Sequence, residues 1–287
     1  MSIYGHTWGG QKEVSVLLDE FSYASEGNSL ARNLAIRAVE IVTGQPQLKR
    51  LYTDYRAEKL PHEAFWQEVI DRLGLDIRMH GAGLDEIPET GPLVVVANHP
   101  YGVLDGIAIC WLVAQVRKDF KILINNVLCR APEMAAHTLP VDFDPTPEAL
   151  QTNLTSRKKA LAHLDAGGVV IVFPAGAIST TPRLLARRAE EVDWAPLVGQ
   201  LVRKTGADVL PVYFAGQNSL LFQVASHMSY AMRVALIFRE VRRRMGTPLD
   251  LAIGKLMPHE TLLAHLPPRN LARHLQAHVA GLSRHIG

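Results

Sequence analysis

The sequence predicts an α/β fold, with a mostly parallel central sheet flanked by helices and a helical extension at the N-terminus. Two continuous β-branched runs, at residues 92–98 ("PLVVVAN") and 169–174 ("VVIVFP"), are typical of parallel strands buried on both faces. From residue 75 onwards, strand patterns alternate with helix patterns, which favours βαβ units. The 287 residues, 48% of them hydrophobic, are enough to build one large core.

The first 74 residues predict helices only. Apolar residues recur at helical spacing over 28–43. Further helices are expected near 48–59 and over 61–74, where Gly74 provides the stop signal. We therefore expect residues 1–74 to form a helical segment with the capacity to associate with a membrane.

Residues 75–255 form the predicted α/β domain, and residues 256–287 a C-terminal helical extension of the same domain. Strand patterns cover residues 76–81, 92–98, 120–125, 138–143, 169–174, 207–216 and 248–256. Helix patterns cover residues 105–118, 146–167 and 195–206, and much of the chain after residue 216.

Polar, glycine-containing loops follow two of the buried strands. His99 comes just after the strand at 92–98, and "PAGAIS" begins with the last residue of the strand at 169–174. In open parallel sheets, ligands bind outside the carboxyl ends of the strands. The two loops are therefore expected to share one edge and one site.

His99 and Asp105 are the candidate catalytic residues in the first loop. A neutral imidazole is a good general base near neutral pH, and a neighbouring carboxylate fixes its tautomer and stabilises its charged form. Pro100 and Gly102 favour a tight turn that would bring Asp105 back to His99. Asp105 also precedes an apolar helix, so a role as its N-cap, or a purely structural hydrogen bond to His99, stays open.

Several other chemistries have no signal in this chain. The sequence has no G-x-S-x-G elbow, P-loop, G-x-G-x-x-G or H-E-x-x-H motif. Cys110 and Cys129 lie in or beside apolar segments without ligand spacing, which favours buried free thiols. The formal net charge of +2 gives no reason to expect a nucleic-acid partner. No metal and no cofactor are expected.

Three segments resemble motifs of the glycerolipid acyltransferase superfamily, in the order that the family has them. "ANHPYGVLDG" (97–106) resembles the first motif, "VVIVFPAGAIS" (169–179) the third, and "ADVLPVYFAGQNS" (207–219) the fourth. The gap between His99 and Asp105 is one residue longer than the common pattern. In this longer gap, and in the forms of the other two motifs, the chain resembles the hemolysin-type branch of the superfamily. That branch includes bacterial enzymes that O-acylate lyso-ornithine and related aminolipids.

The resemblance implies a glycerol-3-phosphate acyltransferase-like fold and an O-acyltransferase. Such an enzyme moves a fatty acyl group from an acyl thioester, either acyl-ACP or acyl-CoA, to the hydroxyl of a lysolipid. His99 would act as general base and Asp105 would orient it. The residues expected to bind substrate or shape its site are Asn98, Gly102, Phe173, Pro174, Ala175, Gly176, Arg130 and Arg183.

Departures from the common motifs bear on the acceptor. The common third motif has Glu where this chain has Ala175, and Thr-Arg where it has Ala177 and Ile178. Arginine is the natural bidentate partner of phosphate, so its loss favours a lyso-aminolipid such as lyso-ornithine lipid. A 1-acylglycerol-3-phosphate (lysophosphatidic acid) acyltransferase, a non-catalytic lipid-binding protein and a thioesterase remain the alternatives.

A lysolipid acceptor implies contact with a membrane surface. The N-terminus lacks a signal-peptide pattern, and the longest apolar stretch is about half of what a membrane span needs. A peripheral or monotopic protein on the cytoplasmic face of the inner membrane is therefore expected. Residues 28–43 fit an interfacial or an ordinary packed helix. The basic clusters fit contacts with anionic lipid or acyl carrier protein, or solvated helix faces: Arg157-Lys158-Lys159, Arg187-Arg188 and Arg242-Arg243-Arg244.

Overall fold

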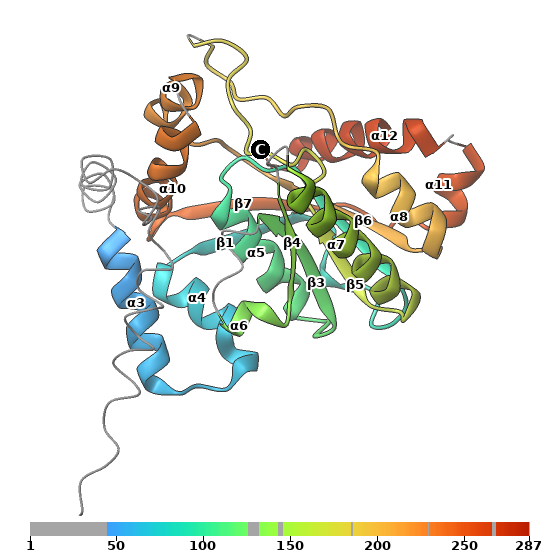
Figure 1. The fold of residues 1–287 in the computed structure, drawn as a ribbon, viewed down its shortest axis with the longest axis horizontal. Helices are drawn as coiled ribbons and strands as arrows, with labels where there is room; N and C mark the ends of the chain where they lie inside the picture. The colour runs from blue at the N-terminus through green and yellow to red at the C-terminus, as the bar shows by residue number, and fades with distance from the viewer. Residues whose placement is uncertain are drawn as a thin grey trace, which may run out of the picture.

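One seven-stranded sheet organises the chain, in the strand order β1-β7-β6-β2-β5-β3-β4 (Figure 1). The computed structural model describes residues 45–125, 132–142, 146–184, 186–228, 230–265 and 268–286. The strands are β1 (Asp76–Gly81), β2 (Leu93–Ala97), β3 (Phe120–Asn125), β4 (Thr138–Val141), β5 (Val169–Val172), β6 (Asp208–Phe214) and β7 (Pro248–Ile253). Each of these strands falls within a segment that the sequence predicts as a strand.

The sheet is parallel except at one junction. β2 pairs in parallel with both β5 and β6, so that Val95 lies opposite Ile171 on one side and Leu210 on the other. β6 and β7 pair antiparallel, and β1 follows the direction of β7. The predicted mostly parallel sheet is therefore confirmed, and its carboxyl edge is shared by β2, β3, β4, β5 and β6.

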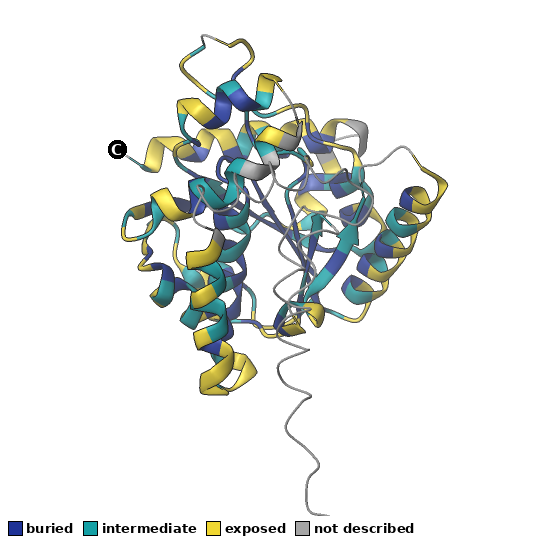
Figure 2. Ribbon diagram, turned by 60° about the vertical axis from the view of Figure 1, so that its left-hand side comes forward, coloured by how far each residue is buried: buried dark blue, intermediate teal, exposed yellow. Residues whose placement is uncertain are grey.

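Helices cover both faces of this sheet (Figures 1 and 2). The α-helices are α3 (Gln45–Glu58), α4 (Phe65–Leu73), α5 (Val103–Ala114), α6 (Pro132–Ala135), α7 (Pro147–Asp165), α8 (Leu197–Thr205), α9 (Leu220–Met228), α10 (Tyr230–Arg244), α11 (His259–His265) and α12 (Pro268–Gly281). The short 3-10 helices are η1 (His62–Ala64), η2 (Leu84–Glu86) and η4 (Leu282–His285).

The alternation of side chains along β2 divides the core into two layers. Leu93, Val95 and Ala97 point into a layer that includes residues of α3, α4, α5 and α10. Val94 and Val96 point into the other layer, with residues of α7, α8, α11 and α12. Because successive residues of a strand face opposite sides, a run without polar residues is what a strand buried on both faces requires.

The helices of the N-terminal part agree with prediction where the structure describes them. α3 and α4 correspond to the helices expected near 48–59 and over 61–74, and Gly74 ends α4 in the left-handed conformation (φ 60°). The helix predicted over 28–43 lies outside the described residues. No helix in the described parts of the chain is both long enough and apolar enough to cross a bilayer.

Candidate active site

The loops after β2, β5 and β6 meet at the carboxyl edge of the sheet. Asn98, directly after β2, holds the end of β6: its Nδ2 donates to the carbonyl oxygen of Phe214 (2.8 Å), and its Oδ1 accepts from the Phe214 N–H (2.7 Å). Both amide atoms of Asn98 are therefore engaged by backbone. This position suits a residue that fastens the loop carrying His99.

His99 and Asp105 lie side by side in this loop. His99 Nδ1 is 3.2 Å from Asp105 Oδ2, without the alignment of a straight hydrogen bond. The Asp105 side chain is fully buried, and 18% of the His99 side chain remains exposed. Catalytic hydrogen bonds are often loose in a free enzyme and tighten around substrate. The geometry thus presents an imidazole to solvent with a buried carboxylate behind it.

Asp105 is not the N-cap of α5. Gly102 is the N-cap, and Asp105 is the third residue of the helix. Its Oδ2 accepts the backbone N–H groups of Tyr101 (2.7 Å) and Gly102 (2.9 Å), which forms half of a capping box. Asp105 therefore both begins the helix and faces His99.

Burial dominates the electrostatics of Asp105. It raises the pKa of this carboxyl above its usual value, while the interaction with His99 and the Gly102 N–H act in the opposite direction. Oδ1 has no hydrogen-bond partner among the described residues. A desolvated negative charge is stabilised strongly by a cation beside it.

Gly102 is required by the close approach of two loops. Its φ is +85°, and a Cβ at this position would lie 2.6 Å from Ile178 Cδ1 in the loop after β5. L-residues rarely adopt this φ, and the space is occupied. Loop geometry thus explains the glycine at this position, and its predicted contribution to substrate binding remains a prediction.

The Phe-Pro-Ala-Gly turn after β5 packs directly against His99. The Phe173 ring lies over the imidazole, with ring centroids 4.1 Å apart. Gly176 closes the turn with φ +67°, and its N–H donates to the Phe173 carbonyl (3.0 Å). Ala175 is half-buried, and Gly176 is exposed. The structure therefore brings two of the three motif loops together around the imidazole.

Of the two candidate arginines, only Arg183 lies within the described residues. Arg130 lies outside the described residues. Arg183 is exposed on a loop that is closed at its base by a bridge between Thr180 and Glu190. Within the described ranges, no hydrogen bond or ion pair joins Arg183 to His99 or Asp105. Their predicted contacts with substrate remain predictions.

Glu191 and Trp194 are site residues that the sequence patterns do not reveal. Glu191 Oε1 accepts the His99 backbone N–H (2.8 Å), and Glu191 Oε2 accepts Trp194 Nε1–H (2.9 Å). Burial raises the pKa of Glu191 to about 6, against the opposing effect of these two donors. Glu191 is 92 residues from His99, belongs to none of the motifs, and carries no local signal that could have identified it.

The third loop, after β6, supports Tyr101. The Tyr101 hydroxyl donates to the carbonyl oxygen of Ala215 (2.8 Å), and the guanidinium of Arg244 lies 4.2 Å above the Tyr101 ring. Arg244 is half-buried and belongs to the predicted basic cluster at 242–244. One member of this cluster therefore packs on the loop that carries His99.

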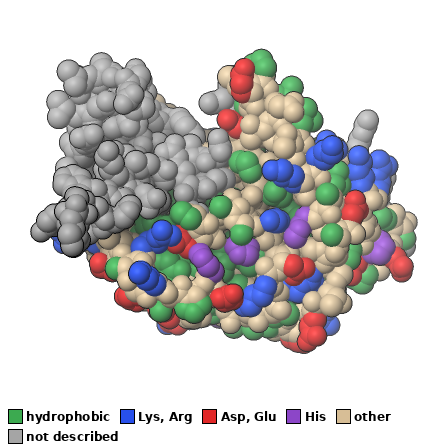
Figure 3. Space-filling model, turned by 60° about the horizontal axis from the view of Figure 1, so that its bottom comes forward, with side chains coloured by type: hydrophobic (Ala, Val, Ile, Leu, Met, Phe, Trp, Pro, Cys, Tyr) green, Lys and Arg blue, Asp and Glu red, His purple; other side chains and the backbone are tan. Residues whose placement is uncertain are grey.

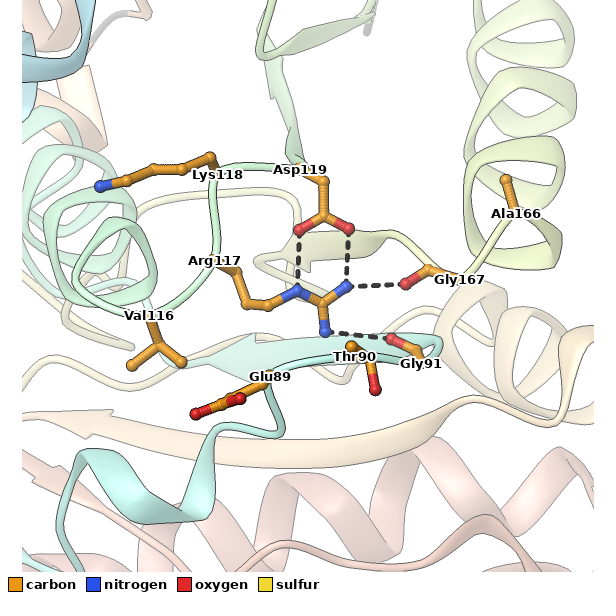
Figure 4. Close-up of a pocket in the computed structure, with 9 residues that line it drawn as sticks. All are labelled: Glu89, Thr90, Gly91, Val116, Arg117, Lys118, Asp119, Ala166 and Gly167. Carbon is orange, nitrogen blue, oxygen red and sulfur yellow. Dashed lines mark hydrogen bonds and ion pairs between the residues drawn. The ribbon is translucent and has the colours of Figure 1, made fainter.

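A concavity lies at the opposite edge of the sheet, around Arg117 (Figure 4). The Arg117 guanidinium pairs with both carboxylate oxygens of Asp119 (2.7 and 2.6 Å). It also donates to the carbonyl oxygens of Pro88, Gly91 and Gly167. Arg117 is buried, and its guanidinium donates to acceptors within the protein. We therefore interpret Arg117 as a structural residue that joins the segments around Pro88–Gly91, Asp119 and Gly167.

Comparisons with known proteins find similarity to acyltransferases. The acyltransferase family model matches residues 77–215. A lyso-glycine lipid O-acyltransferase of Phocaeicola vulgatus is 26% identical over 197 residues, which are 65% of this chain and 67% of the relative. Another of the same name from Bacteroides thetaiotaomicron is 23% identical over 243 residues, covering 76% and 85%.

A solved structure shares the fold. The 1-acyl-sn-glycerophosphate (LPA) acyltransferase PlsC from Thermotoga maritima aligns over 96% of both chains with a TM-score of 0.51 and 17% identity. At this identity the likeness concerns the fold alone. It agrees with the sheet and helix layers described above.

Proposed function

Because this chain is an acyltransferase of the glycerolipid acyltransferase superfamily, we propose that it O-acylates a lyso-aminolipid. Lyso-ornithine and lyso-glycine lipids are the proposed acceptors, and acyl-ACP or acyl-CoA the proposed donor. The observation that carries the proposal is the His99–Asp105 pair at the carboxyl edge. The names of the two bacterial relatives support an aminolipid acceptor, as does the absence of a phosphate-binding Thr-Arg at Ala177 and Ile178.

The placement of the imidazole supports the following proposed reaction. His99 Nδ1 faces Asp105, which leaves Nε2 to take the proton from the acceptor hydroxyl. The oxygen then attacks the thioester carbonyl carbon, and the tetrahedral intermediate collapses with cleavage of the C–S bond. The thiolate takes the proton from His99, so that the products are an ester and a free thiol. With both substrates bound together, no acyl-enzyme is needed.

A matrix of donors and acceptors tests this proposal. Acyl-ACP and acyl-CoA are each supplied with lyso-ornithine lipid, lyso-glycine lipid or lysophosphatidic acid, and the products are identified by mass. We expect acylated aminolipid as the main product. Preferential formation of phosphatidic acid would favour the lysophosphatidic acid acyltransferase instead. Thioester loss without any acceptor would indicate a thioesterase, and binding without turnover a lipid-binding protein.

The proposed membrane contact is supported by a surface beside the dyad. Six of the nine large hydrophobic side chains that are exposed in the described residues belong to the loop after β5 or to α9 and α10: Leu184, Val192, Leu220, Leu221, Met228 and Met232. Arg183, Arg187 and Arg188 are exposed on the same loop. Apolar groups beside cations are the composition that anionic bilayers bind.

The loop and α9 form one surface because they are joined by hydrogen bonds. The Thr181 N–H donates to Gln223 Oε1 (3.0 Å), and Thr181 Oγ1 lies 3.1 Å from His227 Nε2. The Ala189 N–H donates to Gln217 Oε1 (2.7 Å). Figure 1 shows the loop rising above the carboxyl edge near α9, and Figure 2 shows much of it exposed. We call the exposed side chains of this loop and of α9 the carboxyl-edge surface.

The predicted basic clusters differ in their environments. Arg187 and Arg188 belong to the carboxyl-edge surface, whereas Arg243 is within 3.7 Å of Glu240, and Arg244 packs on Tyr101. Figure 3 shows the molecule turned so that the bottom of Figure 1 comes forward, and the described part of this face has basic, acidic and histidine side chains intermixed. The carboxyl-edge surface is therefore our proposed contact with the cytoplasmic face of the inner membrane, with His99 close to the lipid.

Substitution of this surface is expected to weaken binding to vesicles. Replacing Leu184, Leu220 and Leu221 together with serine removes three apolar contacts, and we expect partitioning to anionic vesicles to fall about tenfold or more. Replacing Arg187 and Arg188 with alanine should give a loss of roughly tenfold, greatest at low salt. Cosedimentation with vesicles measures both.

Two exposed leucines elsewhere provide the matched control. Leu150 and Leu154 lie on α7 and are as exposed as the carboxyl-edge leucines. Their replacement with serine is expected to leave vesicle binding unchanged. If binding is lost only when residues 1–44 are removed, the N-terminal segment and not the carboxyl-edge surface is the membrane contact.

A further inference from the structure

The carboxylate of Glu191 lies against the backbone of His99 and is not accounted for by the His99–Asp105 pair. We propose that Glu191 is a positioning residue for acyl transfer, which holds the His99 backbone and adds a negative charge beside the imidazolium that forms during the reaction. The inference rests on the proposed function in that His99 acts as the base. It adds a second carboxylate to the machinery of that site.

The segment that carries Glu191 is fixed at several points. Its preceding residue, Glu190, exchanges two backbone hydrogen bonds with Thr180 (3.2 and 2.9 Å). Trp194 is buried, and its backbone N–H donates to Gln276 of α12 (3.2 Å). The Ala195 N–H donates to the carbonyl oxygen of Pro174 (2.9 Å). The segment is thus hydrogen-bonded to the turn after β5 that precedes it in the chain, and Glu191 is held in place.

The contacts of Glu191 act on the residue that carries the imidazole. The His99 N–H donates to Glu191, and the His99 carbonyl oxygen accepts from the Ser179 N–H (2.8 Å). The next two N–H groups along the chain, of Tyr101 and Gly102, donate to Asp105. The backbone N–H groups of the loop that carries His99 are therefore divided between the carboxylates of Glu191 and Asp105. The position of the imidazole depends on both carboxylates.

The turn after β5 has no carboxylate of its own, because Ala175 stands where the common motif has Glu. Glu191 supplies a partly buried carboxylate to the same neighbourhood from further along the loop. Two charges in a partly buried site interact far more strongly than the same charges in bulk water. Stabilising that cation lowers the barrier to proton removal from the acceptor.

Protonation of Glu191 is expected to reduce this effect. With a pKa of about 6, Glu191 is ionised at neutral pH and becomes neutral as the pH falls through that value. The charged or titratable groups that interact with it are His99, Asp105 and Tyr213, and Tyr213 in turn interacts with Arg188. The acid side of the rate profile should therefore contain a contribution from Glu191.

The central variant is Glu191→Gln, which keeps an oxygen acceptor and removes the charge. We expect kcat to fall about tenfold with little change in KM, because the charge acts on the transition state and not on substrate binding. The matched control is Glu190→Gln, which lies next to it, is exposed and interacts with Thr180 through backbone atoms. This control should retain the wild-type rate.

The pH profile separates positioning from mere structural support. The profile of Glu191→Gln is measured beside that of the wild-type enzyme, and the difference between their acid limbs isolates Glu191. Trp194→Phe keeps a ring but removes the donor to Glu191 Oε2, which raises the pKa of Glu191 and should shift the acid limb to higher pH. Circular dichroism confirms that each variant is folded.

The outcomes distinguish this inference from the proposed function. If the wild-type enzyme transfers no acyl group to any lysolipid, the proposed function is wrong. If the wild-type enzyme is active and Glu191→Gln keeps its kcat and acid limb, the inference about Glu191 is wrong. If Glu191→Gln does not fold, an unshifted acid limb in Trp194→Phe overturns the inference, and a limb shifted to higher pH supports it.

Discussion

Replacing His99 with alanine is expected to lower kcat for acyl transfer by about 10²- to 10⁴-fold. This is the usual contribution of a positioned general base. His99 is the exposed member of the pair, with its ring between Phe173 and the buried Asp105. Its removal leaves no base at this position, while the surrounding loops keep their backbone contacts. The measurement is the initial rate of ester formation, with thermal unfolding to show that the variant remains folded.

A second histidine–carboxylate pair provides the control for this experiment. His80 Nε2 on β1 lies 2.9 Å from Asp250 Oδ1 on β7, in a hydrogen-bonded pair whose two side chains are each 32% exposed. His80→Ala removes an equivalent imidazole and should leave the rate within about twofold of wild type, since surface changes away from a site are usually mild. An active, folded His99→Ala variant would show that His99 is not the base.

Replacing Asp105 with asparagine is expected to lower kcat by a similar factor, about 10²- to 10⁴-fold. The amide oxygen can take the place of Oδ2 and accept the Tyr101 and Gly102 N–H groups, so the first turn of α5 persists. The negative charge that stabilises the imidazolium is lost. The cost in stability should be about 1–3 kcal/mol, because the new amide donors are buried where Oδ1 has no partner among the described residues.

Asp105→Ala separates the two roles of this carboxylate. It leaves the Tyr101 and Gly102 N–H groups unpaired as well, so its free energy of unfolding should be lower than that of Asp105→Asn. We expect the two variants to be equally poor catalysts despite this difference. Urea denaturation and initial rates measure the two quantities. Wild-type kcat in Asp105→Asn would show that Asp105 serves only to begin the helix.

Much of the fold was predictable because its signals are local. The β-branched runs of β2 and β5 predict strands, and strand neighbours in a parallel sheet bring the loops after them to one edge. The five-residue stretch between His99 and Asp105 is short enough for a tight turn to join them. The reversed direction of β1 and β7 was not predictable from patterns of this kind, since strand direction depends on the path of the intervening chain.

Within the site, too, local features could be predicted from sequence, whereas contacts between distant residues could not. The sequence by itself determined the strands, the two edge loops and the pairing of His99 with Asp105, because hydrophobic period and turn chemistry act over a few residues. Only the tertiary structure decided that Asp105 lies inside the first turn of α5, that Asn98 is bound to Phe214, and that Glu191 reaches His99. These contacts join residues through hydrogen bonds that depend on how the whole chain packs. Glu191 is 92 residues from His99, so no local sequence pattern around His99 could indicate that Glu191 binds its backbone N–H.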